Sequence, residues 1–328
     1  LFFALVAASL TACSSDSETP QAPVASKQPI VLGTGMPTMR SNSQTLQATE
    51  LADQTTVGVY IYFNGETTTN ATYTYGYKNI AYKVSGTDGD LAIVTSTDQP
   101  YYPDVKTQNV DIYAFAPQVY SGTAELNTLT AVNDVFATKA DQTAEADYRA
   151  SDFVWGKKAN VAAPSTTSTK QEITMDHMLS KVNINIAAGD GVTLSRLAGA
   201  TIKLNGVKLK GTVNFTTGAV TLDTDASNTA TAVTLTTSTA DQGKLADTTT
   251  DCYTSSAVII PQDIDAADDF IEIKLSNNSV YKWKTTATTP FAAKTKYTFD
   301  ITLSVAGIQL TTTVNNWTDG GTTPGTAE

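Results

Sequence analysis

The sequence predicts an all-β protein made of two β-sandwich domains. Three observations lead to this prediction: apolar residues alternate with polar ones in many short runs, threonine is unusually frequent, and helical periodicity is scarce. Alternation with a period of two is typical of strands, and threonine is β-branched, which favours extended backbone. With 328 residues, of which 41% are hydrophobic and 16% charged, the chain is long enough for two cores of ordinary size.

Five alternating runs define the predicted strands before the C-terminal region. In the strictest of them, Val182, Ile184 and Ile186 alternate with Asn183 and Asn185. We expect each run to turn one face to a core and the other to water. The runs cover residues 57–63, 110–115, 182–186, 202–207 and 271–275.

The C-terminal region predicts a β-hairpin. Apolar and polar side chains alternate through residues 297–305, and a second alternating run follows at residues 308–314. Ala306 and Gly307 separate the two runs. A two-residue connection that contains Gly is typical of a hairpin turn.

Turn-rich and Ala-rich stretches suggest the domain organisation. Pro and Thr gather in residues 162–170, which predicts a boundary between an N-terminal sandwich at 41–165 and a C-terminal sandwich at 166–328. Residues 141–149 predict one short helix. The Gly-rich tail that follows Trp317 predicts a segment without regular structure.

The N-terminal residues 1–13 are typical of a signal peptide. Residues 1–10 are almost wholly apolar, too short a stretch for a spanning helix of about 20 residues. The Cys13 that follows Thr11-Ala12 resembles a bacterial lipobox, so we expect Cys13 to carry lipid; the alternative is an Ala-x-Ala-type site with a chance Cys. The basic start of such a peptide is absent, so we expect the given sequence to begin inside it.

No set of residues suited to catalysis or metal binding stands out. His177 is the only histidine, no G-x-S-x-G motif accompanies it, and its place just before a predicted strand indicates a structural role. Zinc needs three or four His, Cys or acidic ligands, and His and Cys are too few. The acidic residues Asp263, Asp265, Asp268 and Asp269 lack EF-hand spacing and predict a solvated loop.

Nucleic acids and nucleotides are excluded as partners, and no cofactor is predicted. The net charge is −11 and no run of basic residues offers a face for phosphates. Gly33-Thr34-Gly35 resembles the start of a nucleotide loop, but neither a third Gly nor a helix follows. If Cys13 carries lipid, Cys252 has no partner for an internal disulfide and is expected to be a small buried residue.

The alternative function is that of a monomeric surface lipoprotein, either an adhesin or a protein that binds glycans through exposed tyrosines. Tyr73, Tyr75 and Tyr77, with Tyr101 and Tyr102, could stack on sugar rings if exposed. The simpler interpretation is that tyrosines spaced by two form one face of a strand. A glycosidase would need two carboxylates in one pocket, and the sequence singles out no such pair.

Over nearly its whole length the chain resembles the fimbrillin family of Bacteroidia, which are lipoprotein-exported subunits of surface pili. The order and spacing of short motifs carry the resemblance. Besides the lipobox at Cys13, these motifs lie at residues 30–32, 39–40, 110–117, 151–156, 177–182, 211–218, 259–262, 296–299 and 316–321.

The resemblance implies two transthyretin-like β-sandwich domains in tandem and no enzymatic activity. It also implies that an arginine-specific protease cuts the leader between Arg40 and Ser41, which removes the first strand and opens a groove. A C-terminal strand of a neighbouring subunit then fills that groove. Apart from the family, Arg40 is the only Arg in the tether and leader, residues 14–40, and a short apolar strand at residues 30–32 precedes it.

The donor strand implied by the resemblance carries Ile308, Leu310, Thr312 and Val314 on one face. Expected partners are other fimbrial subunits, the protease, the outer membrane through lipid on the precursor, and a host or bacterial surface receptor. Whether the subunit serves in the stalk, the tip or the anchor of a fimbria is left open.

Overall fold

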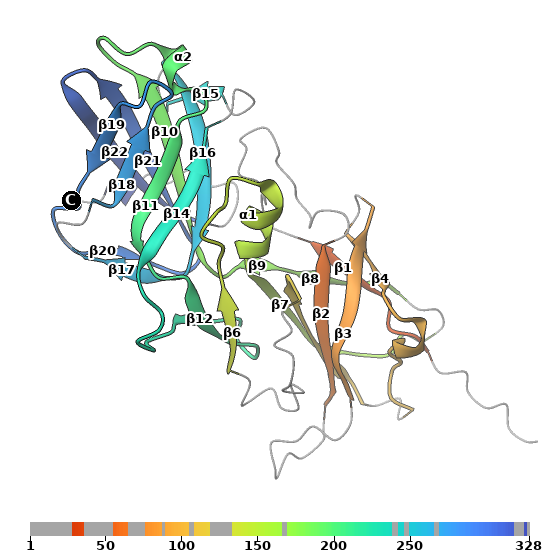
Figure 1. Ribbon diagram of the computed structural model, residues 1–328. Helices are drawn as coiled ribbons and strands as arrows, with labels where there is room; N and C mark the ends of the chain where they lie inside the picture. Colours follow the sequence, from red (N-terminus) through yellow and green to blue (C-terminus); the bar gives the residue numbers. More distant parts are fainter. Residues whose placement is uncertain are drawn as a thin grey trace, which may run out of the picture.

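The computed structural model describes residues 28–35, 55–64, 76–86, 89–104, 108–118, 133–165, 169–237, 242–245, 249–265, 269–317 and 325–326. Most regular elements in these ranges are strands, which confirms the all-β prediction. Figure 1 shows two bodies of strands along one long axis, with helix α1 (Glu145–Ser151) near their junction. Among the described residues, none of the helices has the length and apolar character needed to span a membrane.

The first body is an eight-stranded sheet in the order β8-β1-β4-β3-β2-β5-β7-β9. All neighbouring strands are antiparallel except β1 and β8, which run parallel. The bounds are β1 (Leu32–Gly35), β2 (Thr56–Phe63), β3 (Gly76–Ser85), β4 (Asp90–Ile93), β5 (Val110–Ala116), β7 (Val154–Val161), β8 (Gln171–Thr174) and β9 (Asp176–His177), with a 3-10 turn η1 at Ser96–Asp98.

This sheet closes on itself because its two outer strands are consecutive pieces of one segment. β8 pairs with β1, and directly after Met175 the chain continues as β9, which pairs with β7. At Gly156 of β7, an added Cβ would lie 2.2 Å from the carbonyl oxygen of Thr174. Only glycine permits this close approach of the two backbones. The closed sheet encloses a core that includes Val57, Val59 and Ile61.

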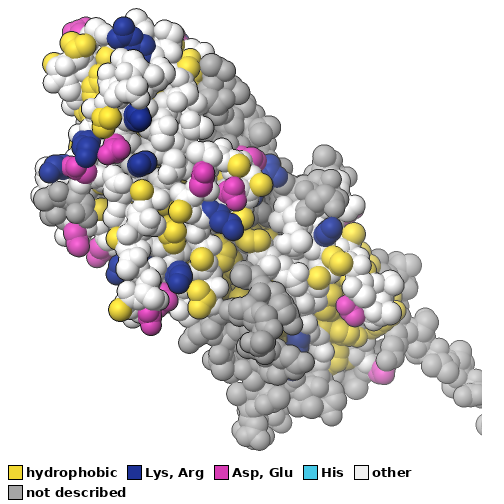
Figure 2. Space-filling view, viewed as in Figure 1, with side chains coloured by type: hydrophobic (Ala, Val, Ile, Leu, Met, Phe, Trp, Pro, Cys, Tyr) yellow, Lys and Arg dark blue, Asp and Glu magenta, His cyan; other side chains and the backbone are white. Residues whose placement is uncertain are grey.

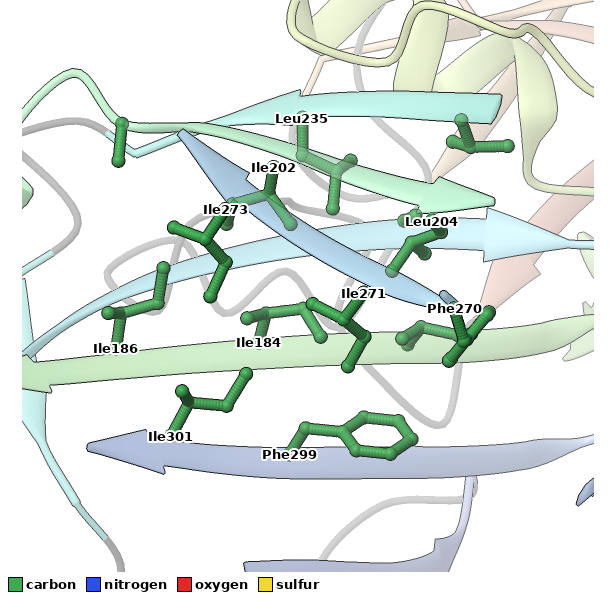
Figure 3. Packing of buried hydrophobic residues seen from close by; sticks show 14 of the residues in the cluster. Ile184, Ile186, Ile202, Leu204, Leu235, Phe270, Ile271, Ile273, Phe299 and Ile301 are labelled. Atoms are coloured by element: carbon green, nitrogen blue, oxygen red, sulfur yellow. The ribbon is translucent and has the colours of Figure 1, made fainter. Parts of the chain in front are cut away.

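The second body is a β-sandwich, as predicted. A six-stranded sheet in the order β15-β16-β10-β21-β22-β23 faces a four-stranded sheet in the order β14-β11-β18-β19. In Figure 3, Ile184 and Ile301 of the first sheet point toward Ile202 and Ile273 of the second. The bounds are β10 (Ser180–Ala188), β11 (Thr201–Val207), β14 (Thr231–Thr236), β15 (Gln242–Lys244), β16 (Asp251–Ile259), β18 (Ile271–Lys274), β19 (Val280–Trp283), β21 (Thr295–Ser304), β22 (Gly307–Asn316) and β23 (Gly325–Thr326).

Smaller elements complete the second body and its junction with the first. β6 (Asn133–Ala137) precedes α1 in the chain but pairs with β12 (Lys210–Asn214), which in turn pairs with β13 (Val220–Leu222). β8 and β9, which follow residue 166, belong to the eight-stranded sheet of the first body. The division of the chain into domains at residue 165 stays a prediction. The remaining elements are β17 (Gln262–Ile264), β20 (Thr289–Phe291) and α2 (Leu194–Leu197).

An aromatic core joins the two bodies. Tyr60 and Tyr62 of β2 are 2% and 3% exposed, although the alternation of the sequence predicted that this face of the strand would meet water. That prediction is wrong for β2, because the face packs on the junction: the rings of Phe115 and Phe215 lie 4.6 Å apart, and Tyr60 contacts both. Tyrosine suits such a place because its ring is largely apolar.

The predicted C-terminal hairpin is confirmed and the predicted helix is shifted. β21 and β22 pair from Ser304↔Gly307 onward, so Val305 and Ala306 form the turn, one residue earlier than the predicted Ala306 and Gly307. The helix begins at Glu145 and not at Asp141. The Asp141 carboxylate accepts hydrogen bonds from both the backbone N–H and the hydroxyl of Thr143, which holds a turn at this point.

Candidate functional site

Strand β1, in the segment that the sequence predicts to be a removable leader, occupies a slot between two neighbours, and this slot is the candidate site. On one side β1 runs parallel to β8, with Leu32–Gly35 paired to Gln171–Thr174. The backbone N–H of Gln171 donates to the carbonyl oxygen of Val31 at 2.8 Å, and that of Met175 donates to Gly35 at 2.8 Å. Parallel pairing requires a long crossover, and here it joins segments more than a hundred residues apart.

The other side of the leader pairs with two different segments. Gly33 lies opposite Asp90 of β4, and the N–H of Thr34 donates to Gly89 at 2.8 Å. Before β1, the N–H of Ile30 donates to Pro100 at 2.9 Å. The side chain of Gln99 adds a hydrogen bond to the Ile30 carbonyl at 3.2 Å. The leader is therefore an internal strand, and its removal would leave backbone groups unpaired on both sides.

The inner face of the leader contributes to the core of the first body. Ile30, Leu32 and Thr34 are each 1% exposed. Full burial of an aliphatic side chain stabilises a fold by roughly 1.5–3 kcal/mol. The Thr34 hydroxyl donates to the carbonyl oxygen of Gly89 at 3.3 Å, which satisfies the one polar group on this face.

The same core contains Tyr102, which the sequence suggested for glycan binding, and also Tyr82. Tyr102 is 4% exposed and Tyr82 is 2% exposed, and burial raises the pKa of both phenols. Tyr77 packs edge-on against Phe63, and its hydroxyl accepts the N–H of Tyr101. These tyrosines support the fold around the leader and do not form an exposed platform.

An ion-pair cluster crosses the outer face of the leader. Lys170 contacts Asp90 of β4 at 2.6 Å and Glu172 of β8 at 2.7 Å, and both carboxylates belong to residues paired with Gly33. These hydrogen bonds raise the pKa of Lys170. Because the cluster is exposed, water and salt screen it, and the buried inner face holds the leader more strongly.

The predicted donor strand lies in β22, at the other end of the molecule. β22 pairs with β21 along its whole length, whereas β23 pairs on the other side only with Thr313 and Val314. Within the described residues no strand pairs with the first part of β22 on that side. Ile308, Leu310, Thr312 and Val314 point to the sandwich but are only half-buried, and Ile308, Leu310 and Val314 pack against the edge of its core.

Trp317, directly after β22, fixes the end of that strand to the junction. Its indole is 4% exposed and stacks on His177 of β9, with ring centroids 4.0 Å apart and planes 6° from parallel. The Nδ1 atom of His177 lies 2.9 Å from a carboxylate oxygen of Asp152, and both side chains are inaccessible to water. The N–H of Trp317 donates to Lys294 at 2.7 Å. His177 is therefore buried at the junction, between Trp317 and Asp152.

Several of the predicted site residues lie where the structure gives no description. Cys13, Arg40 and Ser41 lie outside the described residues, as do Tyr73, Tyr75 and Asp268. Cys252 is buried and free, as expected. Among the described residues no group of three or more His, Cys, Asp or Glu side chains could hold a metal ion.

Comparison with known proteins shows the family. The model of the family described as "Fimbrillin-like" matches residues 42–317. The chain belongs to the fimbrillin-like family. A relative from Bacteroides uniformis, "Putative fimbrium subunit Fim1C", is 25% identical over 326 residues, which cover 97% of this chain and 95% of the relative.

Two solved structures share the fold of this fimbrillin-like chain. Both are described as a "putative cell adhesion protein". The one from Bacteroides ovatus has a TM-score of 0.63 and 18% identity, and covers 90% of this chain and 99% of its own. The one from Bacteroides uniformis has a TM-score of 0.57 and 20% identity, and covers 88% of this chain and 98% of its own.

Sequence reasoning missed two features of the site. The stack of Trp317 on His177 joins residues 140 positions apart (317 − 177), and neither residue carries a local signal of its partner. The pairing of β1 with β8 was likewise hidden, because β8 is only four residues long. The short spacing between the leader strand and Arg40 was the signal that could be found.

Proposed function

We propose that this fimbrillin-like protein is a structural, non-enzymatic subunit of a bacterial surface fimbria that polymerises by strand exchange. In this proposal an arginine-specific protease cuts between Arg40 and Ser41 and releases the leader. A C-terminal strand of a neighbouring subunit then takes its place. The observation that carries the proposal is the leader strand, which is buried between β8 and β4 and lies just before Arg40.

The physics of the leader site favours replacement over an empty site. Without the leader, the inner face would expose apolar side chains that Ile30 and Leu32 now cover. Water would pair with the freed backbone groups but would not cover the apolar surface. Another strand can do both. An incoming strand would restore the backbone hydrogen bonds on both sides and fill the two apolar positions.

The placement of the two strands also supports growth into a filament. The donor strand β22 and the leader site lie in different bodies of the molecule (Figure 1). A contact between one end of a subunit and the other end of the next is head-to-tail, and such contacts do not close on two copies.

Figure 2 shows charged side chains scattered among neutral ones on the face in view, a surface without one dominant charge.

The precursor is proposed to be a lipoprotein that reaches the outer membrane through lipid on Cys13. Leader cleavage would separate the mature subunit from that anchor, because Cys13 precedes Arg40 in the chain. Cys13→Ala should abolish fatty-acid incorporation and release the precursor from membranes. Unchanged labelling of this variant would contradict the proposed anchor.

The test of the main proposal is controlled maturation. Full-length precursor is treated with an arginine-specific protease, and the product is examined by N-terminal sequencing and by electrophoresis under mild denaturation. We expect Ser41 at the new N-terminus and a ladder of oligomers. Arg40→Lys keeps the charge but removes the cleavage site, and it should give neither. Assembled fibres that retain residues before Arg40 would refute the proposal.

A further inference from the structure

We infer that β22 enters the leader site of a second copy in the same direction as β1, with Ile308, Leu310 and Thr312 at the positions of Ile30, Leu32 and Thr34. This inference rests on the proposed strand exchange and specifies its register. It makes the donor strand parallel to β8 and antiparallel to β4 of the acceptor subunit.

The inner faces of the two strands carry the same residues in the same order. Ile30, Leu32 and Thr34 are inward in the leader, and Ile308, Leu310 and Thr312 are inward in β22. In this register each apolar position receives an identical side chain. The Thr312 hydroxyl also reaches the carbonyl oxygen of Gly89, which the Thr34 hydroxyl now contacts.

The outer face has room for the residues by which the two strands differ. Gly33 and Gly35 of the leader correspond to Thr311 and Thr313 of β22. An added Cβ at Gly35 meets no atom within 4 Å. At Gly33 it would lie 2.7 Å from Oε2 of Glu172, the end of a flexible and half-exposed side chain. A small shift of that carboxylate lets it accept a hydrogen bond from the Thr311 hydroxyl.

Shifted registers fit the site less well. A strand keeps its inner face inward only when it shifts by two residues. A shift in one direction places Thr312 at the apolar Leu32 position and buries a hydroxyl among aliphatic side chains. A shift in the other direction places Leu310 at Thr34, where its larger side chain would have to fit a fully buried threonine position.

Burial of its two apolar residues favours β22 in the acceptor site in this register. Ile308 and Leu310 are half-buried in their own sheet, whereas Ile30 and Leu32 are 1% exposed. Ile308 and Leu310 therefore lose more contact with water on entering the acceptor than they gain on leaving their own sheet. β21 stays paired with β10 when β22 departs, and its inner face stays opposite the four-stranded sheet.

Disulfide trapping tests this register on the cleaved full-length protein. Gly33 pairs with Asp90, so the inferred register places Thr311 of one copy opposite Asp90 of the next. Paired Cα atoms of antiparallel strands lie about 4.5–5.5 Å apart, within the range that a disulfide spans. The test variant carries Thr311→Cys with Asp90→Cys. Two controls combine Asp90→Cys with Gln309→Cys or with Thr313→Cys, the positions that would face Asp90 after a shift by two.

We expect an interchain ladder on non-reducing gels for the Thr311 pair, which collapses on reduction, and no such ladder for either control. Polymerisation of each variant under reducing conditions verifies that it folds and assembles. A ladder from a control pair instead, or from none of the three while they polymerise, overturns the register but leaves strand exchange standing. Failure of the cleaved wild-type protein to polymerise overturns the proposed function, and the register with it.

Discussion

The leader segment at residues 30–34, which includes most of β1, and the C-terminal strand β22 present the same inner-face residues but are held in opposite ways. β1 is four residues long, has neighbours on both sides and buries its inner side chains completely. β22 is ten residues long, pairs mainly with one neighbour and leaves its inner side chains only partly buried. The short strand thus depends on depth of burial and the long strand on its hairpin.

This contrast teaches where each strand is vulnerable. Burial of Ile30 and Leu32 makes the leader sensitive to any polar substitution, although few residues hold it. β22 tolerates more on its inner face because that face lies at the edge of the core. Its departure nevertheless requires the hairpin to open and Trp317 to leave His177.

A matched pair of charge substitutions gives the largest expected difference between the two strands. Leu32→Asp should destabilise the precursor by roughly 3 kcal/mol or more, since it removes a buried leucine and adds an unpaired charge. Leu310→Asp should cost less in the monomer, because Leu310 is only partly buried there. Urea unfolding followed by circular dichroism measures both changes.

The same pair should reverse its order in assembly. Leu32 is absent from the cleaved subunit, so cleaved Leu32→Asp protein should polymerise as the wild type does. Cleaved Leu310→Asp protein should remain a folded monomer, because the charge would enter the buried Leu32 position of the acceptor. Normal fibres from folded Leu310→Asp protein would exclude β22 as the donor, and an unfolded variant would indicate that the strand belongs to its own sandwich.

Removal of the indole at the end of β22 is the next largest effect. Trp317→Ala should destabilise the monomer by about 3–5 kcal/mol, since it empties a buried site against His177. Hydrogen exchange of β22 should accelerate more than that of β10. Trp317→Phe retains an aromatic ring on the imidazole and should recover much of the loss. Equal exchange in β22 of the Ala variant and the wild type would show that Trp317 does not hold this strand.

Removal of the Thr34 hydroxyl should have a smaller effect on the stability of the precursor. Thr34→Val keeps the shape but leaves the Gly89 carbonyl without this hydrogen bond, at a cost of about 0.5–1.5 kcal/mol in the precursor. Thr312→Val should leave the monomer nearly unchanged, because Thr312 is only partly buried there. In the polymer, the Thr312 variant should dissociate at a lower denaturant concentration. A polymer of unchanged resistance would contradict the placement of Thr312 at the Thr34 position.

Removal of the ion pairs over Gly33 should have the smallest effect on stability. Lys170→Gln removes the contacts with Asp90 and Glu172, which solvent already screens. We expect the urea midpoint of the precursor to stay within experimental error, with any difference disappearing at high salt. A large loss of stability that persists in 1 M salt would show that this cluster, and not the inner face, holds the leader.

Local patterns predicted much of the fold and part of the site. Alternation identified the long strands and the hairpin β21–β22, because residues close in the chain set both the faces and the turn. The apolar residues 30–32 before Arg40 indicated a leader strand, and β1 begins at the last of them, Leu32, and continues to Gly35. Asp141 was misassigned to a helix because an Asp at the start of an Ala-rich run equally suits a turn.

The sequence by itself determined the long strands, such as β2, β10 and β21, and which of their residues alternate, because period-two alternation is a local property. Only the tertiary structure decided that Tyr60 and Tyr62 are buried in a second core, since alternation does not reveal what covers the other face. The placement of the leader beside β8 and of Trp317 on His177 also arose only on folding. Those contacts join residues more than a hundred positions apart, and their specificity comes from shape and hydrogen bonding between surfaces that no single segment contains.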